Sequence, residues 1–222
     1  MDRVIKVLFF ALLVKPVVLL LLGLNIIGRD NLPKKGPAIV IANHNSHLDT
    51  LVLLSLFPLS VIHKVRPVAA ADYFLGNGGL LAWIALKCIG IIPLDRSGGA
   101  DREVLFSGCT RALSEGDILV LFPEGSRGKP EQMSRLKKGI YYLIKERADI
   151  PVVPAMLHGL GRALPKGEAL LVPFNCDVVI GENLTERETA AGFMNSATAS
   201  FQQLSEYCIT LSSTESAEDK TL

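Results

Sequence analysis

A short polar stretch follows an apolar run near residue 40 and carries side chains that can transfer protons. In the sequence NHNSHLD, residues 43–49, two of the chain's four histidines, His44 and His47, stand close to Asp49. A carboxylate beside a histidine fixes the imidazole tautomer and stabilises the imidazolium, which makes the histidine an effective general base. We therefore predict that His44 is the catalytic base and that Asp49 orients it.

The spacing of this pair restricts where it can lie. On one continuous helix, side chains five residues apart point about 140° away from each other and cannot meet. If His44 lies in a loop and Asp49 in the first helical turn, the carboxylate can reach back to the imidazole. Ser46 and Asp49 also resemble a capping box with Ser46 as the N-cap, so the helix end is the alternative partner of Asp49. We expect that Asp49 cannot fully serve both and favour the imidazole, with His47 as an orienting or surface residue.

The same residues allow a second hypothesis, a metal-dependent hydrolase with His44, His47 and Asp49 as ligands. The run loosely resembles the H-x-H-x-D-H motif of metallo-β-lactamase-like hydrolases. Its first spacing is one residue longer, however, and Thr50 stands where the next histidine should be. We therefore expect no metal ligands and keep this hydrolase as the alternative. A serine hydrolase is disfavoured because Ser126 has a glycine one residue before it rather than two.

A second group of polar residues suits an anion. In the sequence FPEGSR, Gly125 permits close backbone approach of a ligand, and Arg127 offers a planar guanidinium for an oxyanion. Glu124 and Ser126 flank that glycine. Arg96 ends the run GIIPLDR and offers a second guanidinium. These residues predict local anion recognition.

Alternating strands and helices are predicted around these polar groups. Apolar runs of strand length occupy residues 38–43, 66–72, 90–96, 116–123 and 150–157. Helical patterns occupy residues 47–57, 73–88, 101–114 and 139–147, and after a β-rich stretch to residue 180 the sequence TERE (185–188) resembles a capping box that opens a last helix. This alternation predicts an α/β domain with a mixed, largely parallel sheet flanked by helices. Ligands bind at the carboxyl ends of strands in such sheets, where both polar groups are expected.

Composition limits the functions to consider. The net charge of +1 gives no global reason to bind nucleic acid, while 49% of the residues are hydrophobic and the mean hydropathy is +0.36. The four cysteines have no zinc-site or disulfide spacing, so we expect reduced thiols, with Cys88 and Cys109 as small core residues. The high apolar content predicts that part of the chain contacts an apolar solvent.

The apolar excess is concentrated at residues 4–27, VIKVLFFALLVKPVVLLLLGLNII. This length could span a bilayer, but Lys15-Pro16 divides the run into pieces that are each too short. Three arrangements are open: one tilted span, two short helices half-immersed in one leaflet, or a buried helix. We favour membrane contact through two short helices. The predicted organisation is a membrane-associating helical segment at 1–27, a catalytic domain at 28–211 and a disordered polar tail at 212–222.

Four motifs in order resemble those of the glycerolipid (lysophospholipid) acyltransferases, most closely the bacterial 1-acyl-glycerol-3-phosphate acyltransferases. They are NHNSHLD, GIIPLDR, FPEGSR and IPVVPA, within roughly residues 25–165. The resemblance implies that His44 is the base and Asp49 its partner. It also implies that Arg96 and Arg127 hold the acceptor phosphate.

Further roles follow from the same resemblance. Glu124, Gly125 and Ser126 are implied in acceptor binding, and Pro154 in the acyl donor site or the shape of its pocket. Gly128 departs from the serine of many members, which weakens any statement about the head group.

The implied reaction moves an acyl group from acyl-CoA or acyl-carrier protein to a lysophospholipid hydroxyl, with 1-acyl-glycerol-3-phosphate favoured and phosphatidic acid as product. No cofactor is expected. The expected partners are a lipid bilayer, the lysophospholipid and the acyl donor, with no nucleic acid. The expected location is a membrane, favouring the bacterial inner membrane, with the active site facing the cytoplasm. The sequence leaves the head group, the donor, the chain length and the oligomeric state open.

Overall fold

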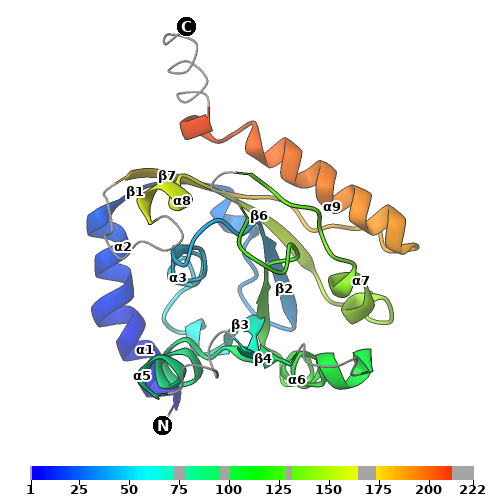
Figure 1. The fold of residues 1–222 in the computed structure, drawn as a ribbon, viewed down its shortest axis with the longest axis horizontal. Helices are drawn as coiled ribbons and strands as arrows, with labels where there is room; N and C mark the ends of the chain where they lie inside the picture. The colour runs from blue at the N-terminus through cyan, green and yellow to red at the C-terminus, as the bar shows by residue number, and fades with distance from the viewer. Residues whose placement is uncertain (1, 73–78, 96–100, 129–131, 165–173, 212–222) are drawn as a thin grey trace, which may run out of the picture.

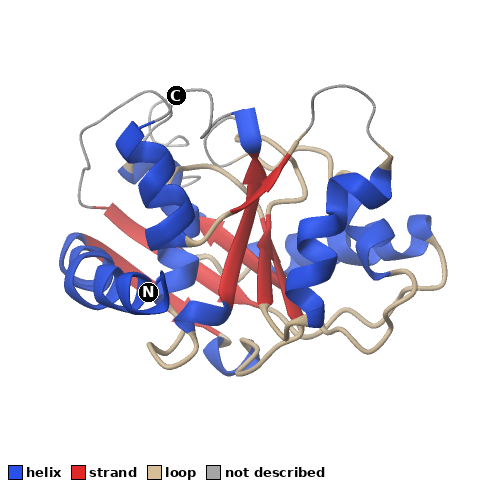
Figure 2. Cartoon of the chain, turned by 90° about the horizontal axis from the view of Figure 1, so that it is seen from below, coloured by secondary structure: helices blue, strands red, loops and turns tan. Residues whose placement is uncertain are grey.

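A seven-stranded sheet in the order β1-β7-β6-β2-β5-β3-β4 forms the centre of the molecule, with helices on both faces (Figure 1). The computed structural model describes residues 2–72, 79–95, 101–128, 132–164 and 174–211. The strands are β1 (Leu22–Ile27), β2 (Ala38–Ala42), β3 (Val65–Ala70), β4 (Ile92–Leu94), β5 (Ile118–Leu121), β6 (Val152–His158) and β7 (Phe174–Ile180). Figure 2 shows these strands crossing the molecule between two groups of helices.

The sheet is mixed and largely parallel. Strands β2, β3, β4, β5 and β6 run in one direction, and β6 pairs with β7 antiparallel. Strand β1 then pairs with β7 in parallel at the edge of the sheet. The predicted fold class is therefore confirmed.

The described helices begin and end close to the predicted positions in most cases. They are α1 (Asp2–Phe9), α2 (Lys15–Leu21), α3 (Leu48–Ser55), α5 (Gly79–Trp83), α6 (Arg102–Ser114), α7 (Gly139–Ile144), α8 (Leu160–Ala163) and α9 (Ala190–Ser205), together with π-helical stretches at Phe10–Val14 and Ile84–Ile89 and short 3₁₀ turns at Arg29–Asn31 and Ile62–Lys64. The predicted β-rich stretch up to residue 180 is partly wrong, because α8 follows β6 directly. The predicted tail at 212–222 lies outside the described residues.

The capping box predicted for the last helix is wrong. Helix α9 begins at Ala190, and the side chain of Thr189 accepts the N–H of Gly192 at 2.9 Å. A β-region residue with a hydroxyl at this position satisfies one of the first unpaired backbone N–H groups of the helix. Four apolar residues of this helix, Phe193, Ala197, Phe201 and Leu204, are buried.

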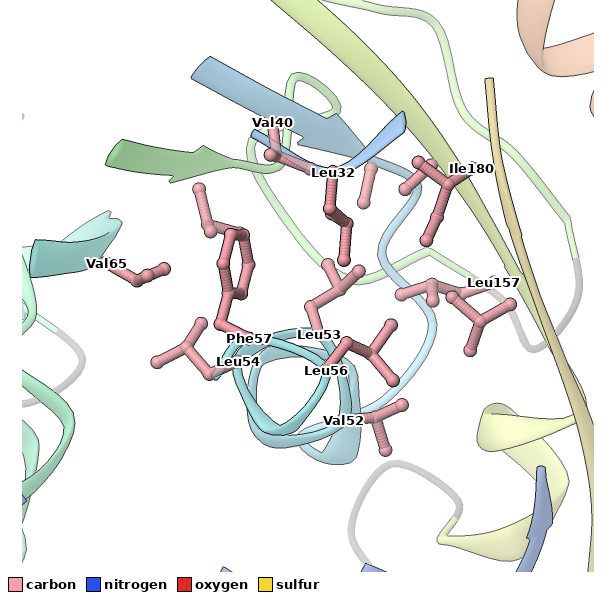
Figure 3. Close-up of a cluster of buried hydrophobic side chains, with 14 of the residues drawn as sticks. Leu32, Val40, Val52, Leu53, Leu54, Leu56, Phe57, Val65, Leu157 and Ile180 are labelled. Atoms are coloured by element: carbon pink, nitrogen blue, oxygen red, sulfur yellow. The ribbon is translucent and has the colours of Figure 1, made fainter. Parts of the chain in front are cut away.

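Strand β2 is buried on both faces, as its continuous apolar sequence predicts. Ala38, Val40 and Ala42 contribute to one core, whereas Ile39 and Ile41 contribute to the other. Helix α3 packs in the first core and presents Val52, Leu53 and Leu54 to the sheet, together with Leu56 and Phe57 just beyond its end (Figure 3). Helices α6, α7 and α9 cover the opposite core.

The N-terminal segment forms one continuous helix from Asp2 to Leu21, so the predicted break at Lys15-Pro16 is wrong. The π-helical stretch precedes Lys15, whose N–H bonds the Phe10 carbonyl, and the helix continues past Pro16 in the first turn of α2. A π-helical turn shifts the backbone hydrogen-bond pattern, so the helix continues although proline has no backbone N–H to donate.

This helix lies against the domain (Figure 1) and ends where the sheet begins. Phe10, Val14 and Val18 pack into the core that holds α3. Lys15 Nζ donates to the carbonyl oxygens of Ser55 and Phe57, at 2.6 and 3.0 Å, where α3 ends. Residues 22–27, which the sequence grouped with the membrane-associating segment, form the edge strand β1.

Candidate active site

The central strands β2 and β5 deliver the polar residues to one edge of the sheet. The two strands are parallel neighbours, with Ile41 opposite Leu121, so the loops that follow them start side by side. The chain after β2 enters α3 on one face, and the chain after β5 leads to α7 on the other. Loops that diverge at the carboxyl ends of adjacent strands are where open α/β sheets bind ligands.

His44 and Asp49 are in direct contact. The imidazole Nδ1 of His44 lies 2.9 Å from Oδ2 of Asp49, whose side chain is fully buried, while 19% of the His44 side chain is exposed. Since a carboxylate only accepts hydrogen bonds, Nδ1 carries the proton and Nε2 holds the lone pair of the neutral imidazole. This is the arrangement of a general base with an orienting carboxylate.

Asp49 serves the helix end as well as the imidazole, which corrects the expectation that it could not do both. Its Oδ2 also accepts the backbone N–H groups of Asn45 at 2.6 Å and Ser46 at 2.8 Å. Ser46 is not the N-cap, because α3 begins at Leu48 with His47 in the cap position. The Ser46 hydroxyl instead accepts the N–H of Leu48 at 3.2 Å and donates to the Leu164 carbonyl at 2.9 Å. The loop thus wraps around one carboxylate oxygen.

Asn43 fixes the start of this loop to the sheet. Its side-chain oxygen accepts the N–H of Leu157 at 2.7 Å, and its side-chain nitrogen donates to the carbonyl of the same residue at 2.8 Å. The amide therefore extends the pairing of β2 with β6 by one residue in place of a backbone group. His44 consequently leaves the sheet at a fixed point.

Glu124 joins the two polar loops. Its carboxylate is 2% exposed, with Oε1 accepting the backbone N–H of His44 at 2.7 Å and Oε2 accepting that of Ser134 at 2.6 Å. Both oxygens therefore contact main chain of this protein. The N–H of Gly128 in turn donates to the His44 carbonyl at 3.2 Å.

Phe122 is a residue of the site that sequence reasoning missed. Its ring stacks on the His44 imidazole with centroids 4.1 Å apart and planes 22° apart. The sequence identified Phe122 only as an apolar residue near the end of a predicted strand. Nothing in its spacing from His44 signals the contact, since the two lie on different strands' loops.

Gly125 and Ser126 of the predicted anion site lie in the loop after β5. Gly125 has a φ of +75°, and a Cβ atom there would lie 2.6 Å from Nζ of Lys137, so backbone conformation and space both favour glycine. Ser126 is exposed beside it. Arg96 lies outside the described residues.

Arg127 lies against His47. Its guanidinium Nη1 contacts the imidazole Nε2 of His47, joining the loop after β5 to the start of α3. Burial lowers the pKa of His47, the positive charges of Arg127 and His44 lower it further, and Asp49 acts in the opposite direction. His47 thus faces a cation, which does not suit a metal ligand, and among the described residues no three His, Cys, Asp or Glu side chains are grouped to hold a metal ion.

This chain is similar in sequence to known acyltransferases. The acyltransferase family model matches residues 23–158, more than half of the chain. A chloroplastic 1-acyl-sn-glycerol-3-phosphate acyltransferase of Arabidopsis thaliana, LPAT1, is 30% identical over 164 residues, covering 71% of this chain and 42% of that protein. The human 1-acyl-sn-glycerol-3-phosphate acyltransferase alpha is 29% identical over 153 residues, covering 68% and 51%. The chain thus spans about half the length of these relatives or less.

A solved structure shares the fold. The 1-acyl-sn-glycerophosphate acyltransferase PlsC of Thermotoga maritima superimposes with a TM-score of 0.69 at 18% identity, covering 90% of this chain and 79% of that one. The matched region of the family model contains β2 to β6 and therefore the His44, Asp49 and Glu124 contacts. On this match, the chain belongs to the acyltransferase family.

Proposed function

We propose that this protein transfers an acyl group from an acyl thioester to the free hydroxyl of 1-acyl-glycerol-3-phosphate, giving phosphatidic acid. The observation that carries the proposal is the contact of His44 with the buried carboxylate of Asp49 at the edge of the sheet. The names of the relatives supply the acceptor, since those proteins are 1-acyl-sn-glycerol-3-phosphate acyltransferases.

In the proposed mechanism, Nε2 of His44 removes the proton of the acceptor hydroxyl. The oxygen attacks the thioester carbonyl, and the tetrahedral intermediate collapses with loss of the thiolate, which takes the proton back from His44. Asp49 stabilises the imidazolium between these two steps. A positioned base supplies roughly 10²–10⁴-fold of the rate enhancement, and holding both substrates together supplies the rest.

Direct transfer needs no acyl-enzyme. All four cysteines are buried and none forms a disulfide, and burial raises the pKa of the Cys109 thiol to about 12. A thiol of this kind is a poor nucleophile at neutral pH. We therefore assign the attack to the acceptor hydroxyl itself and keep acyl-CoA or acyl-carrier protein as the proposed donor.

The acceptor phosphate is assigned to basic side chains of the loop after β5. Arg127 offers a planar guanidinium, and Lys137 lies over Gly125. Arg96 keeps the same proposed role from the sequence. Such local groups allow a chain with a net charge of +1 to hold an anion.

The N-terminal helix is proposed to bring the site to the membrane. It is long and apolar enough to cross a bilayer, yet one side is packed on the domain. Its outer side exposes large apolar residues, with Leu12 74%, Leu19 71% and Leu20 82% exposed. We place it along one leaflet, with the site on the cytoplasmic side, where acyl thioesters are found.

Purified full-length protein in detergent micelles tests the function. It is incubated with acyl-CoA or acyl-carrier protein and with a panel of lysophospholipids, and the acylated product is measured. Phosphatidic acid should form fastest and should survive treatment with a metal chelator. Thioester hydrolysis without transfer, or activity lost to the chelator and restored by zinc, would contradict the proposal and favour the metal-dependent hydrolase.

A further inference from the structure

His47 is the one histidine near the base that the proposed mechanism leaves without a task. It precedes Asp49 by two residues, and its Nε2 contacts the guanidinium of Arg127. An arginine guanidinium can only donate hydrogen bonds, so Nε2 of His47 accepts and the imidazole is neutral in this contact. The two side chains thus meet without a second positive charge.

The charges around His47 favour an anion at this position. Besides burial, the charges of Arg127 and His44 lower the pKa of the His47 imidazole, and only Asp49 raises it. The Asp49 carboxylate is already engaged by His44 and by two backbone N–H groups. A bound dianion would reverse this balance, because an opposite charge within a few ångströms favours the protonated imidazole.

The acceptor's own structure places its phosphate close to the base. In 1-acyl-glycerol-3-phosphate, the reacting hydroxyl and the phosphate ester oxygen sit on adjacent carbon atoms. The group that binds the phosphate must therefore adjoin the group that takes the hydroxyl proton. His44 and His47 are three residues apart in the chain, and a positive charge on His44 lowers the pKa of His47.

We propose that His47 is a specificity-determining residue that binds the acceptor phosphate together with Arg127 and takes up a proton from solvent when a phosphomonoester dianion binds. The inference rests on the proposed function and names what this site selects. A phosphodiester head group carries one negative charge, which Arg127 can balance alone. A phosphomonoester carries close to two at neutral pH, and protonated His47 adds positive charge beside Arg127 to balance the second one.

Proton uptake on binding is the first test. The full chain in detergent is titrated calorimetrically with a short-chain 1-acyl-glycerol-3-phosphate at pH 7.5, in two buffers of different ionisation enthalpy. At this pH the phosphate is already largely doubly ionised. The wild-type protein should take up a substantial fraction of one proton, and His47→Gln should take up almost none. His63→Gln, at a histidine in the 3₁₀ turn before β3, is the matched control and should behave as wild type.

Steady-state kinetics is the second test. His47→Gln should raise the KM for the phosphomonoester about tenfold, the effect of one unit of pKa change on binding, and should change kcat less than twofold. The KM for 1-acyl-glycerophosphocholine, a phosphodiester, should stay the same, so selectivity falls about tenfold. Combining His47→Gln with Arg127→Ala should be less than additive, because both side chains act on one phosphate.

Two results would overturn the inference while leaving the proposed function intact. One is an active wild-type protein whose His47→Gln variant keeps the same acceptor selectivity and proton uptake. The other is a fall in kcat that is equal for both acceptors, which would mean that His47 acts on the base rather than on the phosphate. A folded wild-type protein that acylates no lysophospholipid would remove the proposed function and this inference together.

Discussion

The carboxylate of Glu124 holds the backbone N–H of His44 at 2.7 Å, across 80 residues of sequence. The other oxygen of the same carboxylate holds the N–H of Ser134 at 2.6 Å. The loop that carries His44 is thus joined, through Glu124, to the chain at Ser134. Glu124 thus holds the main chain of His44, the proposed base, while the acceptor binding that its motif implies stays a prediction.

Replacing Glu124 with glutamine tests this role. The amide keeps one oxygen but turns an N–H₂ group toward one of two N–H donors, so one hydrogen bond is lost. We expect kcat to fall about ten- to a hundredfold, with little change in the KM for the acceptor. Glu182→Gln, an exposed carboxylate after β7, should have no effect. A raised acceptor KM with unchanged kcat would instead assign Glu124 to substrate binding.

Two substitutions separate the two tasks of Asp49, its contact with the His44 imidazole and its hydrogen bonds from the loop backbone. Asp49→Asn keeps an acceptor for the backbone N–H groups of Asn45 and Ser46 but removes the charge that stabilises the imidazolium. It should remain folded while kcat falls by on the order of 10² or more. Asp49→Ala should also lower the free energy of unfolding by about 1–3 kcal/mol for each buried donor left unpaired. Thermal unfolding and kcat, measured side by side, distinguish the two; equal kcat values for Asp49→Asn and wild type would argue against the dyad.

Removal of the base should abolish transfer without unfolding the protein. The His44 side chain contacts Asp49 and the Phe122 ring and is partly exposed, so His44→Ala leaves a small gap at the surface of the site. We expect kcat to fall at least 10²–10⁴-fold. Near-native thermal unfolding verifies the fold, and His63→Gln should keep wild-type activity. Substantial transfer by His44→Ala would exclude it as the base.

Membrane binding should depend on the outer side of the N-terminal helix. Burying one leucine in an apolar phase contributes roughly 1.5–3 kcal/mol, so Leu12→Ser with Leu20→Ser should reduce co-sedimentation with phospholipid vesicles by at least tenfold. Val104→Ser, at an apolar residue on α6 that is 65% exposed, is the control and should bind as wild type. Activity on a soluble short-chain acceptor in detergent should persist in both. Unchanged vesicle binding of the double variant would place the membrane contact elsewhere.

The buried carboxylate of Asp177 should make the free energy of unfolding smaller in acid. It is fully buried on β7; burial raises its pKa, but hydrogen bonds from Thr210 and Asn25 outweigh this, and the net pKa is lowered. The unfolded chain therefore binds the proton more readily, and the stability from Asp177 is present above about pH 4 and lost as the pH falls through its folded pKa.

The substitution Asn25→Ala removes one of those bonds, at 2.8 Å to Oδ1. It should lower the free energy of unfolding by about 1.5–3 kcal/mol at pH 7. The difference from wild type should shrink below pH 4, where the carboxyl becomes protonated in both states. Unfolding curves from pH 3 to 7 measure this, with Gln203→Ala on the exposed side of α9 as the control. A difference that is constant across this range would contradict the assignment.

The sequence by itself determined the five strands β2 to β6 and where the polar residues follow them. An apolar run such as 38–43 has one stable environment, a strand covered on both faces, so β2 and the position of His44 after it could be predicted. The continuous helix at residues 2–21 could not, because the effect of Pro16 depends on a π-helical turn that no local propensity encodes.

Only the tertiary structure decided which partners the polar side chains have. Strands β2 and β5 become neighbours through crossover connections, and that pairing alone brings Glu124 and Phe122 to His44 and Arg127 to His47. Asp49 shows the same limit at short range. Its spacing suggested a choice between the imidazole and the helix end, but the folded loop lets one carboxylate oxygen bind both. Sequence spacing gives the distance along a chain, whereas hydrogen bonds and charges act through space, and only the fold relates the two.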